Sequence, residues 1–412
     1  MSSPAIRAVL SAAIGLALFA APASAAQKER APRAPSGSAF YSPPKKLVKG
    51  RAGTVVWSRA SRGLSRLSAA RVNRTIVYRS RSISGKPSVV SGTIAIPKGR
   101  APRGGWPVVS WGHVTTGSAD TCAPSAVTAG NPELERLTRG DEIANLLLER
   151  GIAVARSDFE GIGTPGPHPY LIGKSLGRSM IDIVRAGRSM KLKIGRRWIP
   201  AGHSEGGQGA LFAASMAAAR APELKLRGAS AFAPASHIKD ILELARLVTV
   251  ANPATADFSA LGALILEGAA ISEPSLWSVY REGGGLSSEA LAMLPQTQSK
   301  CLVELARPDS FGGLAPASIE GPGADTLLPA LFKVLDRNDP RVLKLPGVPV
   351  RLDQGLKDFV VMKWHTDEVA ASLSGTGAKV EYVTWPDADH TTITDPAQAA
   401  GPAADWLAAR LR

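Results

Sequence analysis

Short β-rich runs alternate with helical stretches along most of this chain of 412 residues, and the alternation restricts the fold more than any other feature. The runs are rich in Val, Ile and other strand-forming residues, and the stretches between them have helical length and periodicity. Strands separated by such helices form a mostly parallel sheet covered on both faces. We therefore predict an α/β fold with strands at residues 91–97, 107–112, 151–159, 196–202, 230–234, 348–355 and 379–386.

One long stretch breaks the alternation. Residues 236–340 contain apolar helical pieces and Gly/Pro-rich breaks, without a convincing pair of strands. A loop this long inside a compact domain has structure of its own or a function. We interpret it as a helical insertion after the strand at 230–234, serving either as a packed structural subdomain or as a cap over an active site.

The first 25 residues have the pattern of a secretory signal peptide. Arg7 supplies the positive charge, an apolar stretch follows, and Ala23-Ser24-Ala25 provides small residues at the expected cleavage site. The apolar stretch is short for a membrane span, which needs about 20 residues. We expect a cleaved signal and a secreted, periplasmic or cell-envelope location; an uncleaved N-terminal anchor is the alternative.

The net charge of +15 is unevenly distributed. Residues 1–86 hold 16 of the 49 Lys and Arg residues but one of the 34 acidic residues, so the body from residue 87 onward is neutral. We predict a basic N-terminal segment at 26–86, partly an extended tail, followed by the α/β domain at 87–412. The bases either form a solvated surface or dock on anionic lipid or envelope polymer. No zinc-finger or RNA-recognition pattern accompanies them. Given the expected export and the neutral body, we expect no nucleic-acid partner.

The chain contains two cysteines, Cys122 and Cys301. In the oxidising compartment implied by export, two cysteines tend to pair. We predict a disulfide that closes a long loop and stabilises the fold by about 4–5 kcal/mol in the chain-entropy model. No cluster of Cys and His has zinc-site spacing, so we predict no metal site.

The pentapeptide Gly-x-Ser-x-Gly, typical of a serine nucleophile on a sharp turn between strand and helix, occurs twice. In residues 202–206 it follows a strand-like run and precedes an Ala-rich helix, which is the context that exposes the hydroxyl above a helix N-terminus. In residues 173–177 it follows a Gly/Pro-rich loop with no strand before it. We therefore predict Ser204 as the nucleophile and Ser175 as a loop or helix-start residue.

A serine nucleophile needs a histidine base, which follows it in the sequence in α/β-hydrolases. Three of the six histidines lie after Ser204: His237, His365 and His390. His390 lies in a loop directly after the last predicted strand, from which it can reach back over the sheet. The other two open the insertion or lie in a helix-like stretch, where a surface or packing role is simpler. We predict His390 as the base.

The acid that orients the base is expected after the preceding strand. Asp358 lies just past that strand, whereas Asp353 falls within it. Asp387 and Asp389 share a loop with His390 and are too close to it in sequence to orient it easily. We predict Asp358 as the acid, with Asp353 as the second choice.

Four segments, taken in order from about residue 90 onward, resemble the secretory lipase family, the lipase-A-like group of α/β-hydrolases. The combination is far more specific than any single motif. The segments are WGHVTTGSADTCAPS (111–125), SDFEGIGTPGPHPYL (157–171), GHSEGGQGAL (202–211), and QGLKDFVV (354–361) followed by DADH (387–390).

This resemblance implies an α/β-hydrolase fold with a helical cap and hydrolysis of lipid or other hydrophobic acyl esters. Ser204, Asp358 and His390 correspond to the catalytic triad, which uses no cofactor. The amide of Glu205 corresponds to one oxyanion donor, and Thr115 or Thr116 to the second, with Thr116 preferred.

If the insertion covers the site, apolar residues of its central helix are expected to line an acyl pocket: Leu261, Leu264, Ile265 and Leu266. Two alternatives to the ester hydrolase stay open. One is an acyltransferase of the same fold, and the other is a non-catalytic envelope-binding protein on a hydrolase scaffold.

Overall fold

The computed structural model describes Met1 and residues 33–412. Beyond Met1, the predicted signal peptide lies outside the described residues. The part from Arg33 onward forms one compact unit built around a single sheet. Within it, no helix combines the length and apolar character that a membrane span requires.

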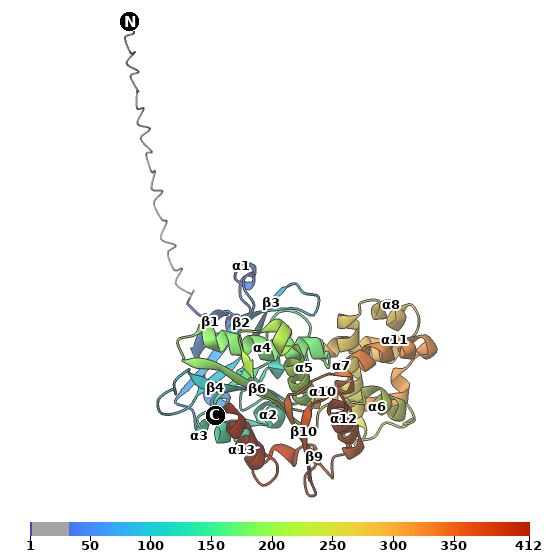
Figure 1. The fold of residues 1–412 in the computed structure, drawn as a ribbon. Coiled ribbons are helices and arrows are strands. Elements are labelled where there is room, and N and C mark those ends of the chain that lie inside the picture. The colour runs from blue at the N-terminus through green and yellow to red at the C-terminus, as the bar shows by residue number, and fades with distance from the viewer. Residues whose placement is uncertain (2–32) are drawn as a thin grey trace. The chain divides into compact units, whose positions relative to one another are not determined.

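The sheet has the strand order β1-β2-β3-β5-β4-β6-β8-β9-β10, with the short β7 pairing to β6 (Figure 1). Neighbouring strands run antiparallel from β1 to β5 and parallel from β5 to β10. The predicted mostly parallel α/β sheet is therefore confirmed. The strands are β1 Val55–Ala60, β2 Val72–Arg81, β3 Pro87–Ile96, β4 Trp106–Gly112, β5 Ala153–Ser157, β6 Ile194–His203, β7 Lys225–Leu226, β8 Ala229–Phe232, β9 Pro349–Gly355 and β10 Lys379–Trp385.

Helices cover both faces of the sheet because both faces are apolar. Val108 of β4 belongs to a cluster with Met180 of α4, whereas the next residue, Val109, packs on the opposite face with Leu147 of α3 and Leu407 of α13. Side chains alternate in this way along a strand that is buried on both faces. The helices that precede β8 or follow β9 are α1 Lys45–Val48, α2 Leu134–Thr138, α3 Asp141–Glu149, α4 Gly173–Ser189, α5 Glu205–Arg220, α12 Lys363–Gly375 and α13 Ala400–Leu411.

Between β4 and β5 the chain forms two helices, α2 and α3, rather than one continuous helix. The break is at Gly140, which has φ +93° and lies against Trp111. A Cβ atom at Gly140 would lie 2.6 Å from the Trp111 ring nitrogen. The left-handed conformation and the close aromatic ring both require glycine there.

The basic segment before residue 87 contributes to the sheet more than the sequence predicted. β1 and β2 lie within it, and β2 pairs with β3 along its whole length, from Val72 opposite Ile96 to Arg81 opposite Pro87. The boundary expected at residue 87 therefore falls inside a hairpin. The frequent arginines of β1 and β2 hid these strands in the sequence, although Val56, Trp57 and residues 75–78 are buried.

Between β8 and β9 the chain forms helices and turns with their own apolar core. This segment, which we call the cap segment, spans the helices α6 Ile238–Ala245, α7 Ala256–Ser272, α8 Leu276–Arg281, α9 Ser288–Met293, α10 Leu302–Leu305 and α11 Ala324–Arg337. Figure 1 shows α6, α8 and α11 grouped at the end of the molecule away from β1. The core centres on α7, whose Leu264 is fully buried.

Candidate active site

Ser204 lies at the turn between β6 and α5. Its backbone has φ 55° and ψ −114°, a conformation that costs free energy for a non-glycine residue and is held by its surroundings. Its amide donates to the carbonyl of Phe232 at the end of β8, and its own carbonyl accepts from the amides of Gln208 and Ala235. These contacts hold the turn that presents the serine hydroxyl.

The glycines around Ser204 are required by the close approach of backbone. A Cβ atom at Gly206 would lie 2.1 Å from the carbonyl oxygen of Gly112, and one at Gly202 would lie 2.3 Å from the carbonyl oxygen of Gly206. The spacing of small residues about the serine thus allows the start of α5 to pack against the ends of β4 and β6.

His390 connects Ser204 to Asp358. The His390 Nε2 atom lies 3.1 Å from the Ser204 Oγ atom, and its Nδ1 atom lies 2.8 Å from the Asp358 Oδ2 atom. A neutral imidazole that donates from Nδ1 to the carboxylate accepts the serine proton at Nε2. The residues predicted as nucleophile and acid therefore both lie within hydrogen-bond distance of the predicted base, His390.

The carboxylate of Asp358 is held in a loop turn just past β9. Its Oδ1 atom accepts the amides of Val360 and Val361, both at 2.8 Å. Asp353, the second choice, is engaged elsewhere. Its carboxylate receives the guanidinium of Arg351 at 2.7 and 2.8 Å and the indole NH of Trp385 at 3.0 Å.

The other serine and histidine candidates lie outside the group formed by Ser204, His390 and Asp358. Ser175 is buried in the first turn of α4 and donates to the carboxylate of Glu160. His237 and His365 stack on each other with ring centroids 4.9 Å apart, where the cap segment begins beside α12. Neither histidine contacts Ser204, which agrees with the packing role expected for them.

The loop after β4 separates the two threonines proposed as oxyanion donors. Thr115 lines the same cavity as Ser204, and its hydroxyl lies 2.8 Å from that of Tyr170. Thr116 is buried; its hydroxyl donates to the carbonyl of Cys122, and its carbonyl accepts the amide of Leu302 at 3.1 Å. The loop is thus bound on one side to the cap segment.

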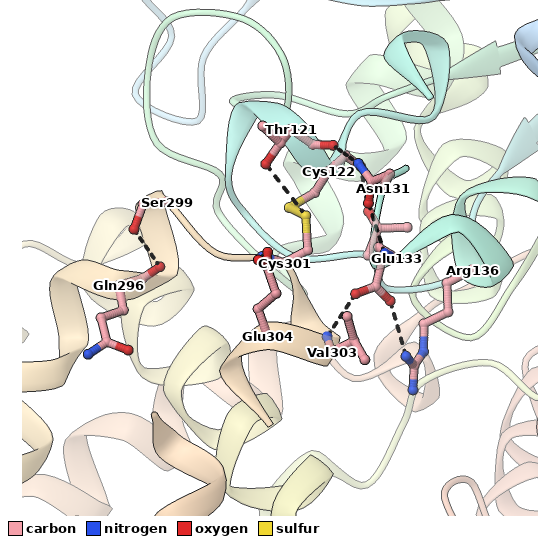
Figure 2. The surroundings of a disulfide bond; sticks show 11 residues. Thr121, Cys122, Asn131, Glu133, Arg136, Gln296, Ser299, Cys301, Val303 and Glu304 are labelled. Atoms are coloured by element: carbon pink, nitrogen blue, oxygen red, sulfur yellow. Dashed lines mark hydrogen bonds and ion pairs between the residues drawn. A yellow bond between two sulfur atoms is a disulfide. The ribbon is translucent and has the colours of Figure 1, made fainter. Parts of the chain in front are cut away.

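A disulfide strengthens that link, as predicted from the two cysteines. Cys122 and Cys301 are bonded across a sequence separation of 179 residues (Figure 2). The backbone of Cys301 also forms an antiparallel β-bridge with that of Gly117 in the loop after β4. The covalent bond therefore joins the loop after β4 to the start of α10.

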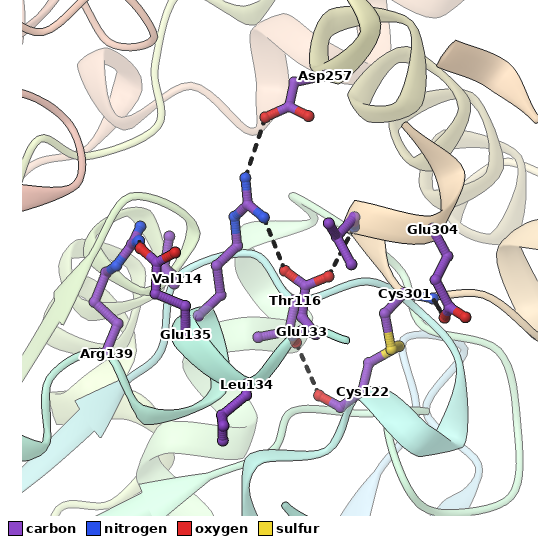
Figure 3. A network of polar contacts seen from close by, with 12 residues as sticks. Val114, Thr116, Cys122, Glu133, Leu134, Glu135, Arg139, Asp257, Cys301 and Glu304 are labelled. Atoms are coloured by element: carbon purple, nitrogen blue, oxygen red, sulfur yellow. Dashed lines mark hydrogen bonds and ion pairs between the residues drawn. A yellow bond between two sulfur atoms is a disulfide. The ribbon is translucent and has the colours of Figure 1, made fainter. Parts of the chain in front are cut away.

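A polar network lies beside the disulfide. Figure 3 shows the Glu133 carboxylate between an arginine and the start of α10. Glu133 accepts the amide of Val303 at 2.7 Å and the guanidinium of Arg136 at 3.1 Å, and that guanidinium also reaches Asp257 of α7 at 3.1 Å. Arg136 therefore bridges the core layer and the cap segment at the wall of the cavity.

Glu205, the residue after Ser204, forms a buried pair that the sequence did not reveal. Its Oε1 atom lies 2.9 Å from the Nε2 atom of His168, whose Nδ1 atom lies 2.7 Å from the carbonyl oxygen of Glu160. Burial alone would lower the pKa of His168, but the hydrogen bond and charge of Glu205 outweigh it and raise that pKa. A His in a Pro-rich loop far from the pentapeptide carried no signal of this contact.

A second histidine adjoins the site from the pentapeptide itself. The rings of His203 and His390 have centroids 4.9 Å apart. Burial, and then the charge of His390, lowers the pKa of His203 well below its ordinary value, so His203 is neutral at pH 7. Within residues 33–412 there is no group of three or more His, Cys, Asp or Glu side chains placed to hold a metal ion.

A cavity of about 330 Å³ contains Ser204 and His390 in its wall and extends beneath the cap segment. Of the residues expected to line an acyl pocket, Leu261 and Ile265 face it. Leu264 instead packs in the core of the cap segment, and Leu266 lines a separate small cavity. Positions one turn apart on α7 share a face, so only part of the apolar run reaches the cavity.

The lining of this cavity is mainly apolar. The side chains from α6, α7 and the loop after β9 include Ile241, Leu242, Phe258, Phe359 and Val360. The polar exceptions include Arg136, Arg139 and Asp257 along one wall. An apolar cavity with a few converging polar groups is the usual form of a small-molecule site.

The comparisons with known proteins agree with this architecture. Candida antarctica lipase A in its closed state superposes with a TM-score of 0.71 at 20% identity, covering 87% of this chain and 83% of that one. The rice cell wall degrading esterase LipA from Xanthomonas oryzae, in a ligand-bound form, gives a TM-score of 0.68 at 19% identity, covering 88% of this chain and 100% of that one. At these identities the likeness shows the fold, which confirms the predicted α/β-hydrolase fold.

No curated protein matches the sequence significantly. The model of one protein family does match, over residues 138–412, and its description is secretory lipase. This range covers two thirds of the chain and includes Ser204, Asp358 and His390. The chain belongs to the secretory lipase family and is a hydrolase of the lipase and esterase type.

Proposed function

We propose that the protein is an exported serine hydrolase of carboxylic esters that works through an acyl-enzyme, with Ser204, His390 and Asp358 as its triad. The observation that carries the proposal is the pair of hydrogen bonds centred on His390, 3.1 Å to Ser204 and 2.8 Å to Asp358. A base within this distance of a serine hydroxyl meets the geometric requirement for proton transfer.

In the first step the Ser204 Oγ atom attacks the acyl carbonyl carbon, and its proton passes to the Nε2 atom of His390. Asp358 keeps the imidazole in the required tautomer and stabilises the imidazolium without taking the proton. His390 then protonates the leaving alkoxide, so the C–O bond of the ester breaks and an alcohol departs. Water, deprotonated by His390, hydrolyses the acyl-enzyme and releases the acid and the free serine.

The tetrahedral intermediates need amide donors for their oxyanion. We assign one donor to the amide of Glu205, at the start of α5, and the other to the amide of Thr115. The location of Thr115 on the wall of the cavity that contains Ser204 supports this choice over Thr116, which does not line that cavity. The buried His168 partner of Glu205 would keep the start of α5 in place.

The cap segment would hold the acyl chain. Leu261, Ile265 and Phe258 supply apolar surface within the cavity that contains Ser204, which suits a hydrophobic acyl group. A series of esters from short to long acyl chains tests this assignment. Activity that rises with chain length supports a lipase, and a short-chain optimum supports an esterase.

Export rests on the signal-like pattern of residues 1–25 and on membership of a secretory family. The disulfide fits an oxidising compartment. The cations of the basic segment support contact with an anionic partner in that compartment. N-terminal sequencing of the protein recovered outside the cytoplasm tests the cleavage after Ala25.

The direct test is hydrolysis of a soluble chromogenic ester by Ser204→Ala beside wild type. We expect kcat to fall by a factor of about 10⁴ or more, because removal of a triad nucleophile leaves only binding and the oxyanion donors. Ser175→Ala, which alters the second Gly-x-Ser-x-Gly pentapeptide, is the matched control and should keep its activity. Equal activity of Ser204→Ala and wild type would refute the proposal.

Hydrolysis and acyl transfer are separated by adding an alcohol acceptor at fixed ester concentration. A hydrolase releases one molecule of free acid for each molecule of alcohol that leaves the ester, even when the acceptor is present. Transfer of most acyl groups to the acceptor would identify an acyltransferase with the same triad. If no ester is turned over, the protein is instead a non-catalytic binding protein on a hydrolase scaffold.

A further inference from the structure

The edge of the sheet at β1 carries an unusual excess of positive charge. Residues 33–86 contain 13 Lys and Arg residues and no Asp or Glu. In the described part of the chain none of these 13 side chains forms an ion pair, whereas arginines of the body such as Arg156 and Arg185 pair with carboxylates. We call the surface formed by residues 33–86 the basic edge.

Some of these cations form hydrogen bonds within the fold. The guanidinium of Arg79 donates to the carbonyls of Leu47 and Lys49, and that of Arg74 donates to the hydroxyl of Ser58. Others, including Arg62 and Arg66, are exposed to solvent. A surface of like charges with no counter-charge attracts an anionic partner and destabilises itself when no partner is bound.

A groove lies on the basic edge. It has a volume of about 390 Å³ and is lined by two arginines, by four hydroxyl-bearing residues and by small apolar residues and a glycine: Arg59, Arg62, Ser36, Ser65, Thr75, Ser125, Ala34, Pro35, Ala60, Ala126, Val127 and Gly37. Arg59 is held in place, with its guanidinium 4.1 Å from the centre of the Phe40 ring and a hydrogen bond to the carbonyl of Gly37. Two guanidinium groups in one groove match the carboxylates of an acidic polymer.

The groove is separate from the active-site cavity. None of the residues that line one lines the other. β1 is at one edge of the sheet, whereas Ser204, Asp358 and His390 follow β6, β9 and β10 in the other half. Figure 1 places β1 and α1 on the side of the molecule away from α6, α8 and α11. A partner bound at the basic edge therefore leaves the cavity open.

From these observations we propose that the basic edge binds an acidic polysaccharide, with Arg59 and Arg62 in the groove holding its carboxylates and the other cations following the polymer. The proposal goes beyond the ester hydrolysis and rests only on the proposed export. It makes the protein an enzyme retained on a polyanionic glycan through one edge while its active site faces elsewhere.

A lipid bilayer fits the basic edge less well. Peripheral proteins combine cations with apolar side chains that enter the acyl region. Within residues 33–86 the only exposed large apolar side chain is Leu64, at 42% exposure. The groove is also concave, which suits a chain of sugar rings rather than a flat headgroup surface.

The test measures binding of the mature protein to polygalacturonate, to neutral dextran and to vesicles with a quarter of anionic lipid, at low and physiological salt. We expect binding to polygalacturonate that weakens as salt rises, and none to dextran. Arg62→Gln/Arg66→Gln removes two exposed cations and should weaken that binding at least tenfold. Arg100→Gln/Arg103→Gln removes the same charge from an exposed loop outside the groove and should change it less than twofold.

All variants should hydrolyse a soluble ester at the wild-type rate, which shows that they are folded. A further variant, Arg59→Gln, tests the groove itself and should also reduce polygalacturonate binding. Three results would overturn the proposal: no binding to polygalacturonate, equal weakening by the two double variants, or binding to vesicles with none to the polysaccharide. A failure here leaves the serine mechanism untouched, and an inactive Ser204→Ala leaves this binding untouched.

Discussion

Removal of the disulfide by the double substitution Cys122→Ser/Cys301→Ser is expected to weaken both the fold and catalysis. The bond closes a loop with a sequence separation of 179 residues. In the chain-entropy model, a loop of this length removes about 17–18 cal/mol/K from the unfolded state, equivalent to about 5 kcal/mol at 25 °C. The expected loss is therefore a large part of the stability of an ordinary domain.

The size of the loss translates into a measurable shift of melting temperature. Unfolding of the described body, residues 33–412, carries an entropy of about 0.8 kcal/mol/K at about 2.1 cal/mol/K per residue. A loss of about 5 kcal/mol then lowers the Tm by about 6 °C. Calorimetry of wild type, the double variant and reduced wild type measures this shift, and the last two should agree.

Catalysis should suffer because the disulfide adjoins the loop after β4. The carbonyl of Thr116 accepts the amide of Leu302, next to Cys301, and Thr115 lies beside it on the cavity wall. A looser loop places the oxyanion donor less accurately, so kcat should fall about tenfold, less than the loss of a whole donor. The KM should change less, because the apolar cavity remains.

Two results would refute this reasoning. An unchanged Tm would show that the bond does not constrain the unfolded chain as the loop length implies. A lower Tm with an unchanged kcat would show that the loop after β4 keeps its geometry through its hydrogen bonds alone, and that the disulfide has no part in the oxyanion site.

Three further predictions address the turn, the pH dependence and the acyl pocket. Gly206→Ala should reduce kcat at least 100-fold, since its Cβ atom would meet the carbonyl oxygen of Gly112, whereas Gly401→Ala, with open space in α13, should retain activity; equal kcat values would contradict the packing argument. Burial, followed by the charge of a neighbouring histidine, lowers the pKa of His365 from 6.5 to about 4, so the unfolded state binds more protons and stability should fall as the pH drops from about 6.5 to about 4. The urea midpoint of His365→Gln at pH 8 and pH 5 should show a smaller difference than wild type. Phe258 lines the active-site cavity and two neighbouring apolar cavities, so Phe258→Ala should raise kcat/KM for long acyl esters relative to short ones, and an unchanged ratio in the ester series would disprove that connection.

Several features were accessible from the sequence because their signals are local. The strand runs and helical periodicity predicted the parallel part of the sheet, since both patterns express burial within a few consecutive residues. The two pentapeptides were distinguished by the strand before Ser204 and the loop before Ser175. The positions of His390 and Asp358 after successive strands indicated where these side chains would converge, because parallel strands end at one edge of the sheet.

Other features depended on which neighbouring group each side chain reaches in the folded chain. Asp358 meets His390, whereas Asp353 is engaged by the guanidinium of Arg351 on the same strand. The threonine facing the cavity is decided by the Cys122 carbonyl, which engages Thr116. Residue type and spacing alone do not tell which of several nearby hydrogen-bond partners a polar side chain takes.

The sequence by itself determined the fold class, the disulfide pair and a short set of candidate residues, because periodicity, cysteine number and motif order are properties of the chain. The tertiary structure alone decided the pairing of Glu205 with His168, the extent of the sheet into the basic segment, and the side of α7 that faces the cavity. Those features arise from packing and hydrogen bonds between residues far apart in the sequence, and they exist only once the sheet has assembled.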